Sequence, residues 1–423
     1  MKVLIAGGGT GGHIYPAIAI AEKIKRKLPE SQILFIGARQ GMEKDLVPTR
    51  GFPIRLIDVK GFSRKNPLKN LDVAMTVFKS IRQVQEIIDE FKPDVAVGFG
   101  GYVSGPVIRT AAKSGVRTFI MEQNALPGLA NQMAERYAEK VFIAFAEGEK
   151  HFKDKDKLVV TGNPIRKEFY AVSLHDYRKK LGVKENEFAL LCFGGSLGAK
   201  AICEAFSAIL NDLYKYNNIK IFFVTGSYYF NDVVQRLQNS GLPFEIIESD
   251  ANAEASEDRQ PVESAAQGGG RVVRPDIANG KQKGGIISDS DIALKAEERI
   301  YIIEYSKRLH EYMAAADLIV SRSGALTVSE IAACGKASIL IPSPNVTGNH
   351  QYFNACTLAD RGAAVLIPEN DLTPMKLLDI ILRLKNNKRR INEMSKACAE
   401  LGRFDASDII YDYISAVLPR TSS

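Results

Sequence analysis

The sequence has little cysteine and no long apolar run. Its five cysteines are scattered along 423 residues and never form a C-x-x-C pair, so neither structural disulfides nor a zinc site is expected. No stretch approaches the roughly 20 apolar residues that a membrane-spanning helix needs. The first apolar run, at 3–6, is short and ends in glycines, unlike a secretory signal. These absences predict a chain that is made and kept inside the cell.

Length and charge limit the possible organisation. A chain of 423 residues predicts two domains, and 45% hydrophobic with 25% charged residues is typical of a soluble globular protein. The net charge of +7 is uneven: residues 1–165 hold 25 Lys and Arg against 17 Asp and Glu. The stretch 60–82 has six basic residues and one acid. It suits phosphates or an anionic membrane surface, although a solvated basic helix face is the alternative.

Both halves of the chain open in the same way. "VLIAGGGTGGHIYPAIAIAEKI" (3–24) and "FALLCFGGSLGAKAICEAFSAIL" (188–210) each predict a strand, a glycine turn and a helix. Short apolar runs then alternate with helical patterns, the first helix being expected at 16–28. The sequence therefore predicts the α/β class, with two Rossmann-like doubly wound domains, 1–165 and 166–402, facing a central cleft. A C-terminal helix at about 403–423 can pack back on the first domain.

One segment breaks this alternation. Residues 248–300 contain no aromatic residue, six glycines and 18 charged residues. They offer little apolar surface to offset the entropy of ordering, so we expect a mobile surface insertion. A small independent subdomain is the alternative.

The opening loop satisfies the dinucleotide pattern G-x-G-x-x-G at Gly7, Gly9 and Gly12. A dinucleotide site also needs an acid at the end of the second strand, which here ends in "GAR" without one. Arg39 can meet a 2′-phosphate, so NADP stays open. The loop and the helix start favour a negatively charged ligand, and tight strand–helix packing is the alternative.

Three further stretches carry groups suited to a phosphate or a ribose. "GGSLGAK" lacks the Walker A spacing, but Ser196 and its neighbouring amides can bind a phosphate. In "VTGNPIRKEF" the planar cation of Arg166 suits a diphosphate, or else forms a linker salt bridge. In "SRSGALTVSEIAACG" the carboxylate of Glu330 can accept from both hydroxyls of a ribose, or else serve the helix dipole.

Two glycine-containing stretches and one acidic pair remain. "GFGGYVSGP" (98–106) and "MEQNALPG" (121–128) each follow a predicted strand, at the sheet edge where ligands bind. The D-x-D pattern at 154–156 matches metal-dependent sugar transferases. It lies in the lysine-rich run "KHFKDKDK", which indicates a solvated loop. No metal site is therefore expected.

Taken together, the chain resembles the bacterial MurG-type N-acetylglucosaminyltransferase family, glycosyltransferase family 28, which converts lipid I to lipid II. The resemblance rests on "GGTGGHIYPAIAIA", "GGYVSGP", "EQNALPGLAN", "GNPIR", "GGSLGA", "RSGALTVSEIAACG" and "NHQYFNA", in that order. It covers nearly the whole chain apart from 248–300. It implies a GT-B fold with the active site between two Rossmann domains, and chemistry that requires no metal or other cofactor.

The resemblance also implies a set of site residues. Glu330 would bind the ribose, Gln351 the sugar hydroxyls, and the region of Ser306 the uracil, although "EYSKRLHEYM" departs from the family pattern there. The acceptor would bind at Gly100, Gly101 and Tyr102. The full set of contacts implied for UDP-N-acetylglucosamine is Thr10, Gly11, Gly12, Asn124, Arg166, Ser196, Ser306, Ala325, Leu326, Thr327, Val328, Ser329, Glu330 and Gln351.

An inverting displacement needs a base for the attacking 4-hydroxyl of the muramyl sugar, and donors for the departing diphosphate. His13 is the candidate base, because the unperturbed pKa of histidine lies near neutrality. Glu122 is the rival base. The alternative for His13 is a hydrogen bond to its own loop or to a phosphate. Ser196, Arg166 and helix N-termini would take the leaving-group charge.

The helix expected at 68–91 places Leu71, Met75, Phe78 and Ile81 on one face. Basic residues flank this stripe, namely Lys65, Lys69, Lys79 and Arg82. An apolar face with basic surroundings suits interfacial attachment, and burial in the protein core is the alternative. With the resemblance, it predicts a peripheral enzyme at the cytoplasmic face of the bacterial membrane. Its partners would be UDP-N-acetylglucosamine, lipid I and the anionic membrane surface, without nucleic acid.

Three other functions remain open at the level of sequence. A GT-B transferase that glycosylates diacylglycerol would share the fold but lack the combination of "EQN" and "GGYVSGP". An NAD(P)-binding oxidoreductase would need the missing strand-end acid. A non-catalytic nucleotide-sugar-binding scaffold would bind the donor without releasing UDP.

Overall fold

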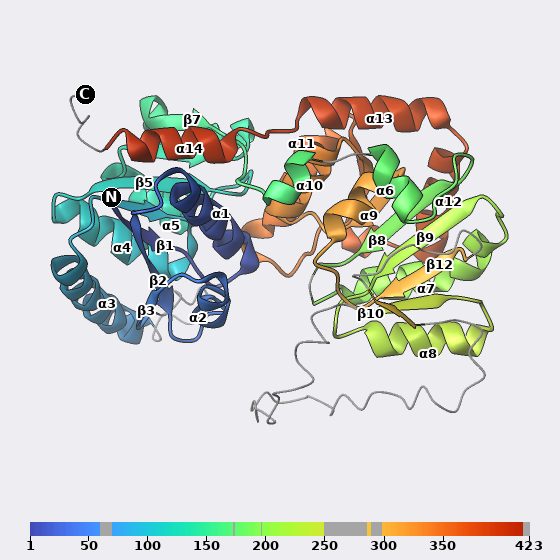
Figure 1. The fold of residues 1–423 in the computed structure, drawn as a ribbon, viewed down its shortest axis with the longest axis horizontal. Helices are drawn as coiled ribbons and strands as arrows, with labels where there is room; N and C mark the ends of the chain where they lie inside the picture. Colours follow the sequence, from blue (N-terminus) through green and yellow to red (C-terminus); the bar gives the residue numbers. More distant parts are fainter. Residues whose placement is uncertain (60–69, 172–173, 196, 249–285, 289–297, 418–423) are drawn as a thin grey trace.

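The computed structural model describes residues 1–59, 70–171, 174–195, 197–248, 286–288 and 298–417. The side chains of 70–75, 170–171, 174–175, 248 and 286–288 are not described. The chain forms two lobes, each built around a parallel sheet with helices on both faces (Figure 1). None of the helices in the described ranges is long and apolar enough to cross a bilayer.

The first lobe holds a seven-stranded parallel sheet in the order β3-β2-β1-β4-β5-β6-β7. Its strands are β1 (Lys2–Ala6), β2 (Gln32–Ala38), β3 (Ile54–Ile57), β4 (Val95–Gly98), β5 (Arg117–Glu122), β6 (Lys140–Ile143) and β7 (Leu158–Val160). Its helices are α1 (Gly11–Lys27), α2 (Glu43–Leu46), α3 (Asn70–Phe91), α4 (Gly101–Lys113) and α5 (Leu129–Ala134). The central strands are buried on both faces, which is why they consist of continuous apolar runs.

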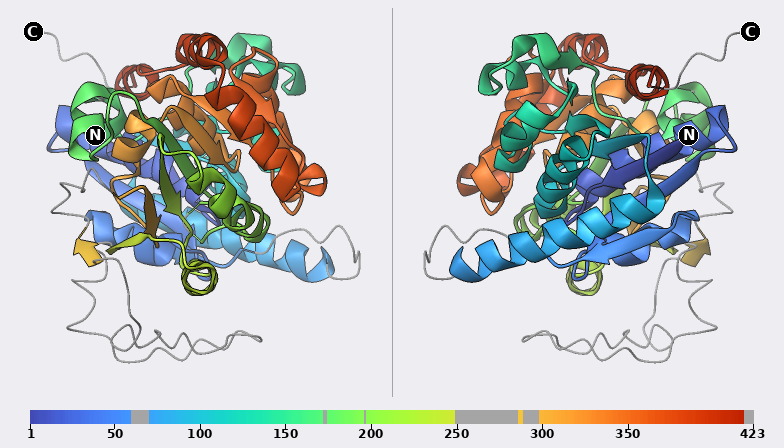
Figure 2. Two further views of the ribbon diagram at one scale, coloured as in Figure 1. Left: turned by 90° about the vertical axis from the view of Figure 1, so that its right-hand side faces the viewer. Right: turned by 90° about the vertical axis from the view of Figure 1, so that its left-hand side faces the viewer.

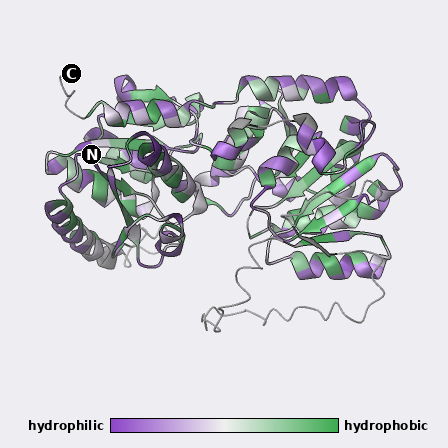
Figure 3. Ribbon diagram, viewed as in Figure 1, coloured by the Kyte–Doolittle hydropathy of each residue, from purple (hydrophilic) through white to green (hydrophobic). Residues whose placement is uncertain are grey.

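The second lobe holds an eight-stranded parallel sheet in the order β11-β10-β12-β9-β8-β13-β14-β15. Its strands are β8 (Phe188–Phe193), β9 (Ile219–Val224), β10 (Glu245–Glu248), β11 (Ile286–Ser288), β12 (Ile300–Ile303), β13 (Leu318–Ser321), β14 (Ala337–Leu340) and β15 (Ala364–Leu366). Its helices are α6 (Leu174–Lys180), α7 (Lys200–Tyr214), α8 (Phe230–Ser240), α9 (Leu309–Ala315), α10 (Ala325–Cys334), α11 (His350–Ala359), α12 (Pro374–Lys385) and α13 (Lys388–Glu400). The strands are mainly apolar, whereas α13 on the outside is mainly polar (Figure 3).

The strand orders confirm the doubly wound α/β class. In the first sheet the order reverses between β1 and β4, and in the second between β8 and β13. At such a switch point the loops after the two strands diverge to opposite faces, leaving room for a ligand beyond their carboxyl ends. Each lobe therefore offers one such position.

The last helix, α14 (Ala406–Ser415), returns to the first lobe (Figure 1). Ile410 and Ile414 are fully buried there, in the same core cluster as Ile14, Ala17 and Ile24. Lys23 of α1 forms an ion pair with Asp408. The C-terminal helix is thus part of the hydrophobic core of the first lobe.

The expected insertion at 248–300 is too broad at its ends. Glu248 closes β10, residues 286–288 form β11, and Ile300 begins β12. Ile246 and Ile247 of β10 pair with Ile286 and Ile287 of β11. A three-residue apolar strand extends an existing sheet edge, although it is too short to produce a clear sequence pattern. Residues 249–285 and 289–297 lie outside the described ranges.

Candidate functional site

A buried carboxylate accepts a hydrogen bond from the loop between β1 and α1. Glu43 is fully buried, and its two oxygens accept from the Gly9 amide at 3.0 Å and the Ala38 amide at 2.8 Å. A Cβ on Gly8 would lie 2.1 Å from Glu43 Oε1, so a side chain cannot stand at that position. Glu43, the acid that follows β2, therefore stabilises this loop. Its carboxylate is not placed to bind the ribose hydroxyls of a dinucleotide. Arg39, whose side chain is exposed, pairs with an aspartate.

His13 lies at the switch point of the first sheet with one ring nitrogen fixed. Its Nδ1 is 2.9 Å from the Gly8 carbonyl oxygen. Because a carbonyl only accepts, Nδ1 is the donor there, and Nε2 of a neutral ring is left to accept a proton. A Cβ on Gly100 would lie 3.1 Å from Nε2, and one on Gly101 would lie 2.4 Å from the Gly8 oxygen. The two glycine loops thus meet at the imidazole.

Both glycines of the second loop have a backbone that other residues rarely adopt, with φ of +93° at Gly100 and +78° at Gly101. The next residue, Tyr102, lies in the first turn of α4 and is 59% exposed. The structure therefore brings the expected base and the expected acceptor residues to one place.

Glu122, the rival base, is 2% exposed and accepts from four donors. Oε1 accepts from the backbone and side-chain nitrogens of Asn124 at 2.9 and 3.2 Å. Oε2 accepts from the Gly128 amide at 3.0 Å and from Asn131 Nδ2 at 2.9 Å. This carboxylate organises the loop from β5 to α5.

In the second lobe, Arg166 and Glu330 contact each other. Both Nε and Nη2 of Arg166 lie 3.3 Å from Glu330 Oε1, and the guanidinium covers the ring of Phe169. Burial raises the pKa of the Glu330 carboxyl, and Arg166 opposes this shift. About a third of the Arg166 side chain is exposed, so it can still meet an anion. The cation expected for a diphosphate thus lies beside the acid expected for a ribose.

The start of α10 presents mainly backbone groups. No side chain caps its first turn at Gly324, so its free N–H groups can serve an anion. Val328 is fully buried and Ala325 nearly so, whereas Leu326 and Thr327 are partly exposed. Ser329 Oγ accepts from Asn163 Nδ2 at 3.0 Å.

Two other expected donor contacts were at Ser306 and Ser196. Ser306 is 6% exposed, and its Oγ accepts from the Arg308 amide at 3.0 Å. Ser196 lies outside the described residues. In the first lobe, Thr10 and the helix start at Gly11 and Gly12 are at least partly exposed. The side chain of Thr10 makes no capping bond to the backbone of α1, and its Oγ1 lies 3.5 Å from His13 Nδ1.

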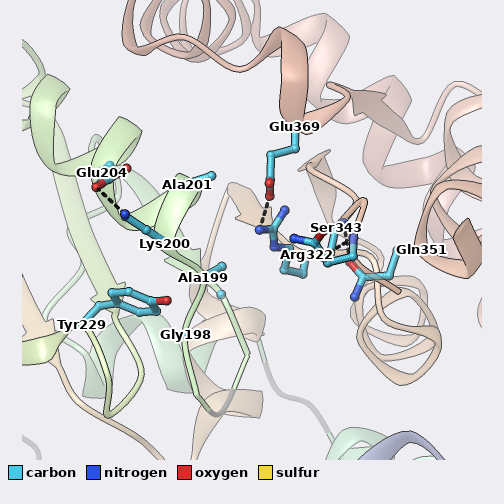
Figure 4. A pocket seen from close by; sticks show the side chains of 12 residues that line it. Gly198, Ala199, Lys200, Ala201, Glu204, Tyr229, Arg322, Ser343, Gln351 and Glu369 are labelled. Carbon is cyan, nitrogen blue, oxygen red and sulfur yellow. Dashed lines mark hydrogen bonds and ion pairs between the residues drawn. The ribbon is translucent and has the colours of Figure 1, made fainter. Parts of the chain in front are cut away.

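A cavity of about 560 Å³ opens at the switch point of the second sheet (Figure 4). Gln351 lines it, and its side-chain oxygen accepts from the Ser343 amide at 2.9 Å, which leaves its amide nitrogen to donate to a ligand. Arg322, directly after β13, forms an ion pair with Glu369, and both side chains line the cavity. Other lining residues include Gly194, Gly198, Lys200, Glu204 and Tyr229.

The sequence analysis missed Glu43, Arg322 and Asn354. Arg322 had a usable signal, because it follows a strand end at the carboxyl edge of the sheet. Glu43 had none, because its hydrogen bond to the Gly9 amide joins residues 34 positions apart. Asn354 lies in the stretch "NHQYFNA", but its partners in the first lobe are 229 and 230 positions away.

Within the described residues, no group of three or more His, Cys, Asp or Glu side chains could hold a metal ion. All five cysteines are free thiols. Burial raises the pKa of the Cys203 thiol to about 11, which keeps it protonated and unreactive at neutral pH.

The membrane stripe expected on α3 is only partly described. Phe78 is 77% exposed, whereas Ile81 is partly buried. Leu71 and Met75 lie in α3, but their side chains are not described. Two of the flanking cations are compensated by acids, since Lys79 pairs with Asp58 at 2.9 Å and Arg82 with Glu86 at 3.2 Å.

Comparison with known proteins identifies the class. The glycosyltransferase family 28 N-terminal domain matches residues 3–143, and the family 28 C-terminal domain matches residues 282–410. Two Rossmann-like lobes with these matches define a glycosyltransferase of the GT-B fold. The chain belongs to glycosyltransferase family 28.

Curated relatives match over nearly their full length. A UDP-N-acetylglucosamine--N-acetylmuramyl-(pentapeptide) pyrophosphoryl-undecaprenol N-acetylglucosamine transferase of Thermoanaerobacter sp. (strain X514) is 37% identical over 417 residues, covering 99% of this chain and 100% of the relative. The protein of the same name from Clostridioides difficile (strain 630) is 33% identical, covering 100% and 90%.

Solved structures share the fold. Acinetobacter baumannii MurG superposes with a TM-score of 0.69 at 23% identity, covering 98% of this chain and 99% of that one. S. aureus MnaA with UDP superposes with a TM-score of 0.60 at 16% identity, covering 98% and 96%. At these identities the structures show the GT-B architecture.

Proposed function

We propose that this chain transfers N-acetylglucosamine from UDP-N-acetylglucosamine to the 4-hydroxyl of the muramyl sugar of lipid I, which makes lipid II for peptidoglycan. The observation that carries the proposal is the 33–38% identity, over nearly the whole length, to relatives named for this transfer. The placement of an imidazole whose Nδ1 is held by the Gly8 carbonyl in one lobe, and of a polar cavity in the other, supports it.

On the acceptor side, His13 is the general base. The 4-hydroxyl oxygen attacks the anomeric carbon, the bond from that carbon to the UDP oxygen breaks, and the hydroxyl proton passes to His13 Nε2. The displacement inverts the anomeric configuration. Gly100, Gly101 and Tyr102 would bind the acceptor beside this ring. Glu122 does not serve as base in this scheme, because four donors already occupy its oxygens.

On the donor side, Glu330 accepts from the ribose hydroxyls, and Arg166 faces the diphosphate as the leaving group gains charge. Gln351 donates to the sugar hydroxyls, and the backbone near Ser306 meets the uracil. Amides at 10–12, near Ser196 and at the start of α10 add to this stabilisation. Arg166 and these N–H donors stabilise the charge on the departing diphosphate without a metal ion.

The acceptor is a polyprenyl lipid, so the enzyme works at a bilayer. We place it at the cytoplasmic face of the bacterial membrane, held peripherally by α3, which extends outward from the first lobe (Figure 2). The exposed Phe78 and the excess of cations in 60–82 support attachment to an anionic surface. Nucleic acid is not among the proposed partners.

The test is UDP release from UDP-N-acetylglucosamine with and without a short-chain lipid I analogue, in buffer with a metal chelator. The proposal expects release that depends on the analogue and persists in chelator, with one N-acetylglucosamine added to the analogue. Diacylglycerol is the control acceptor and should yield no product. A glycosylated diacylglycerol, or donor binding without release under any condition, would contradict the proposal.

A further inference from the structure

An asparagine of the second lobe joins the two lobes. Asn354, in α11, is fully buried. Its side-chain oxygen accepts from the Ala125 amide at 2.9 Å, and its side-chain nitrogen donates to Asn124 Oδ1 at 3.1 Å and to the Ser323 carbonyl at 3.3 Å. Both protons and the oxygen of the amide are therefore used, and two of the three partners belong to the first lobe.

The contact continues through Asn124 to Glu122. Asn124 accepts from Asn354 with its oxygen and donates to Glu122 Oε1 with its nitrogen at 3.2 Å. The other oxygen of Glu122 accepts from Asn131 Nδ2 at 2.9 Å. In a buried setting such a chain of side-chain hydrogen bonds holds its members in one arrangement. The segment from β5 to α5 is thereby tied to α11.

The far end of this chain reaches the proposed base. A Cβ on Gly100 would lie 3.5 Å from Asn131 Nδ2 and 3.1 Å from His13 Nε2. Both side chains therefore border the same side of Gly100, and Asn131 lies close to the imidazole of His13.

The near end of the chain reaches the cavity of the second lobe. Gln351, which lines that cavity, lies three residues before Asn354 and so on the adjacent turn of α11. Ser323, whose carbonyl accepts from Asn354, donates its hydroxyl to the Gln351 carbonyl at 2.7 Å. Helix α11 thus carries both Gln351, which lines the cavity, and Asn354, which forms hydrogen bonds to the first lobe.

We propose that Asn354 is a positioning residue for this transfer. Through Asn124, Glu122 and Asn131 it holds the base of the first lobe in place relative to the donor sugar bound in the second. Alignment of the reacting atoms is sensitive to displacements of about 1 Å, and nothing in the Asn354 side chain needs to touch substrate. The inference rests on the proposed function.

The test compares Asn354→Ala with Arg361→Ala. Arg361 forms an exposed ion pair between the lobes with Glu147 at 3.5 Å, so its loss removes an inter-lobe contact that is not part of the chain. We expect Asn354→Ala to lower kcat with the lipid I analogue about 100-fold and to leave the affinity for UDP-N-acetylglucosamine nearly unchanged. The ring resonance of His13, observed with isotope-labelled histidine, should shift in Asn354→Ala and stay in place in Arg361→Ala.

The outcomes separate this inference from the proposed function. Wild-type protein that transfers nothing overturns the proposed function itself. Active wild type together with folded Asn354→Ala of equal kcat overturns the inference, as does a loss of donor affinity equal to the loss in kcat. If Asn354→Ala does not fold, Asn354→Ser decides, because its hydroxyl can keep part of the network. An intermediate kcat with unchanged affinity supports the inference, and an unchanged kcat overturns it.

Discussion

The sequence offered two candidates for the general base, His13 and Glu122, and their hydrogen bonds distinguish them. The carboxylate of Glu122 is buried and accepts from Asn124, Gly128 and Asn131. The imidazole of His13 makes one close hydrogen bond through Nδ1 and keeps Nε2 for a proton. Sequence could name both residues, but the donors that occupy Glu122 follow only from the folding of the loop around it.

The first prediction concerns this base. His13→Ala should lower kcat with the lipid I analogue by about 100- to 10,000-fold, the usual contribution of a general base. The affinity for UDP, measured by calorimetry, should change little. Added imidazole should restore part of the turnover in His13→Ala. It should restore none in Glu122→Gln, where the defect lies in the loop, and wild-type turnover of His13→Ala would reject the assignment.

The second prediction concerns the pH dependence of donor binding. Burial raises the pKa of Glu330, so its carboxylate takes up a proton at a higher pH than an exposed glutamate does. Ribose hydroxyls bind the ionised form better, so the affinity for UDP-N-acetylglucosamine should fall as pH is lowered toward that raised pKa. Glu330→Gln should bind about 10- to 100-fold more weakly at neutral pH and lose this acidic dependence. Equal pH profiles in both proteins would contradict the assignment.

At the scale of elements, sequence located most strands but misjudged boundaries set by tertiary contacts. The first helix was expected at 16–28, yet α1 begins at Gly11 and contains Pro16. The start of the helix at 11–15 was not predicted, because its glycines are typical of a turn. β11 and β12 were missed because their pairing with β10 and β9 is what makes them strands. The buried support of the loop by Glu43 was equally invisible, because it depends on a contact between elements.

The third prediction concerns α3. Phe78→Glu should abolish sedimentation with anionic vesicles and leave the thermal midpoint within a few degrees, because the side chain is 77% exposed. Met375→Glu is the matched control, since Met375 is 70% exposed on α12 of the other lobe. It should bind vesicles like wild type. Unfolding of Phe78→Glu, or equal vesicle binding by both variants, would contradict membrane attachment through α3.

The fourth prediction concerns α14. Ile410→Ala should lower the free energy of unfolding of the first lobe by about 2–5 kcal/mol, because it opens a cavity in a fully packed core. Asp412→Ala, on the exposed side of the same helix, should change it by less than about 0.5 kcal/mol. Denaturant titration followed by circular dichroism measures both. Equal effects of the two substitutions would show that α14 does not contribute to this core.

At the scale of the whole molecule, the proposed reaction needs both lobes. The first lobe carries His13 and the glycine loops, and the second carries Arg166, Glu330 and the cavity beside Gln351. The two glycine-turn openings in the sequence sufficed to predict two Rossmann-like lobes. The asparagine contacts that join them, from Asn163 and Asn354, could not be read from one chain because they connect residues more than 150 positions apart.

The central claim is a single inverting displacement on an α-linked donor. It is tested most directly by the anomeric proton coupling in the disaccharide made from UDP-N-acetylglucosamine and the lipid I analogue. The account predicts a β-linked N-acetylglucosamine on the muramyl 4-oxygen, formed as UDP is released. An α-linked product, or UDP released with no sugar on the acceptor, would contradict it.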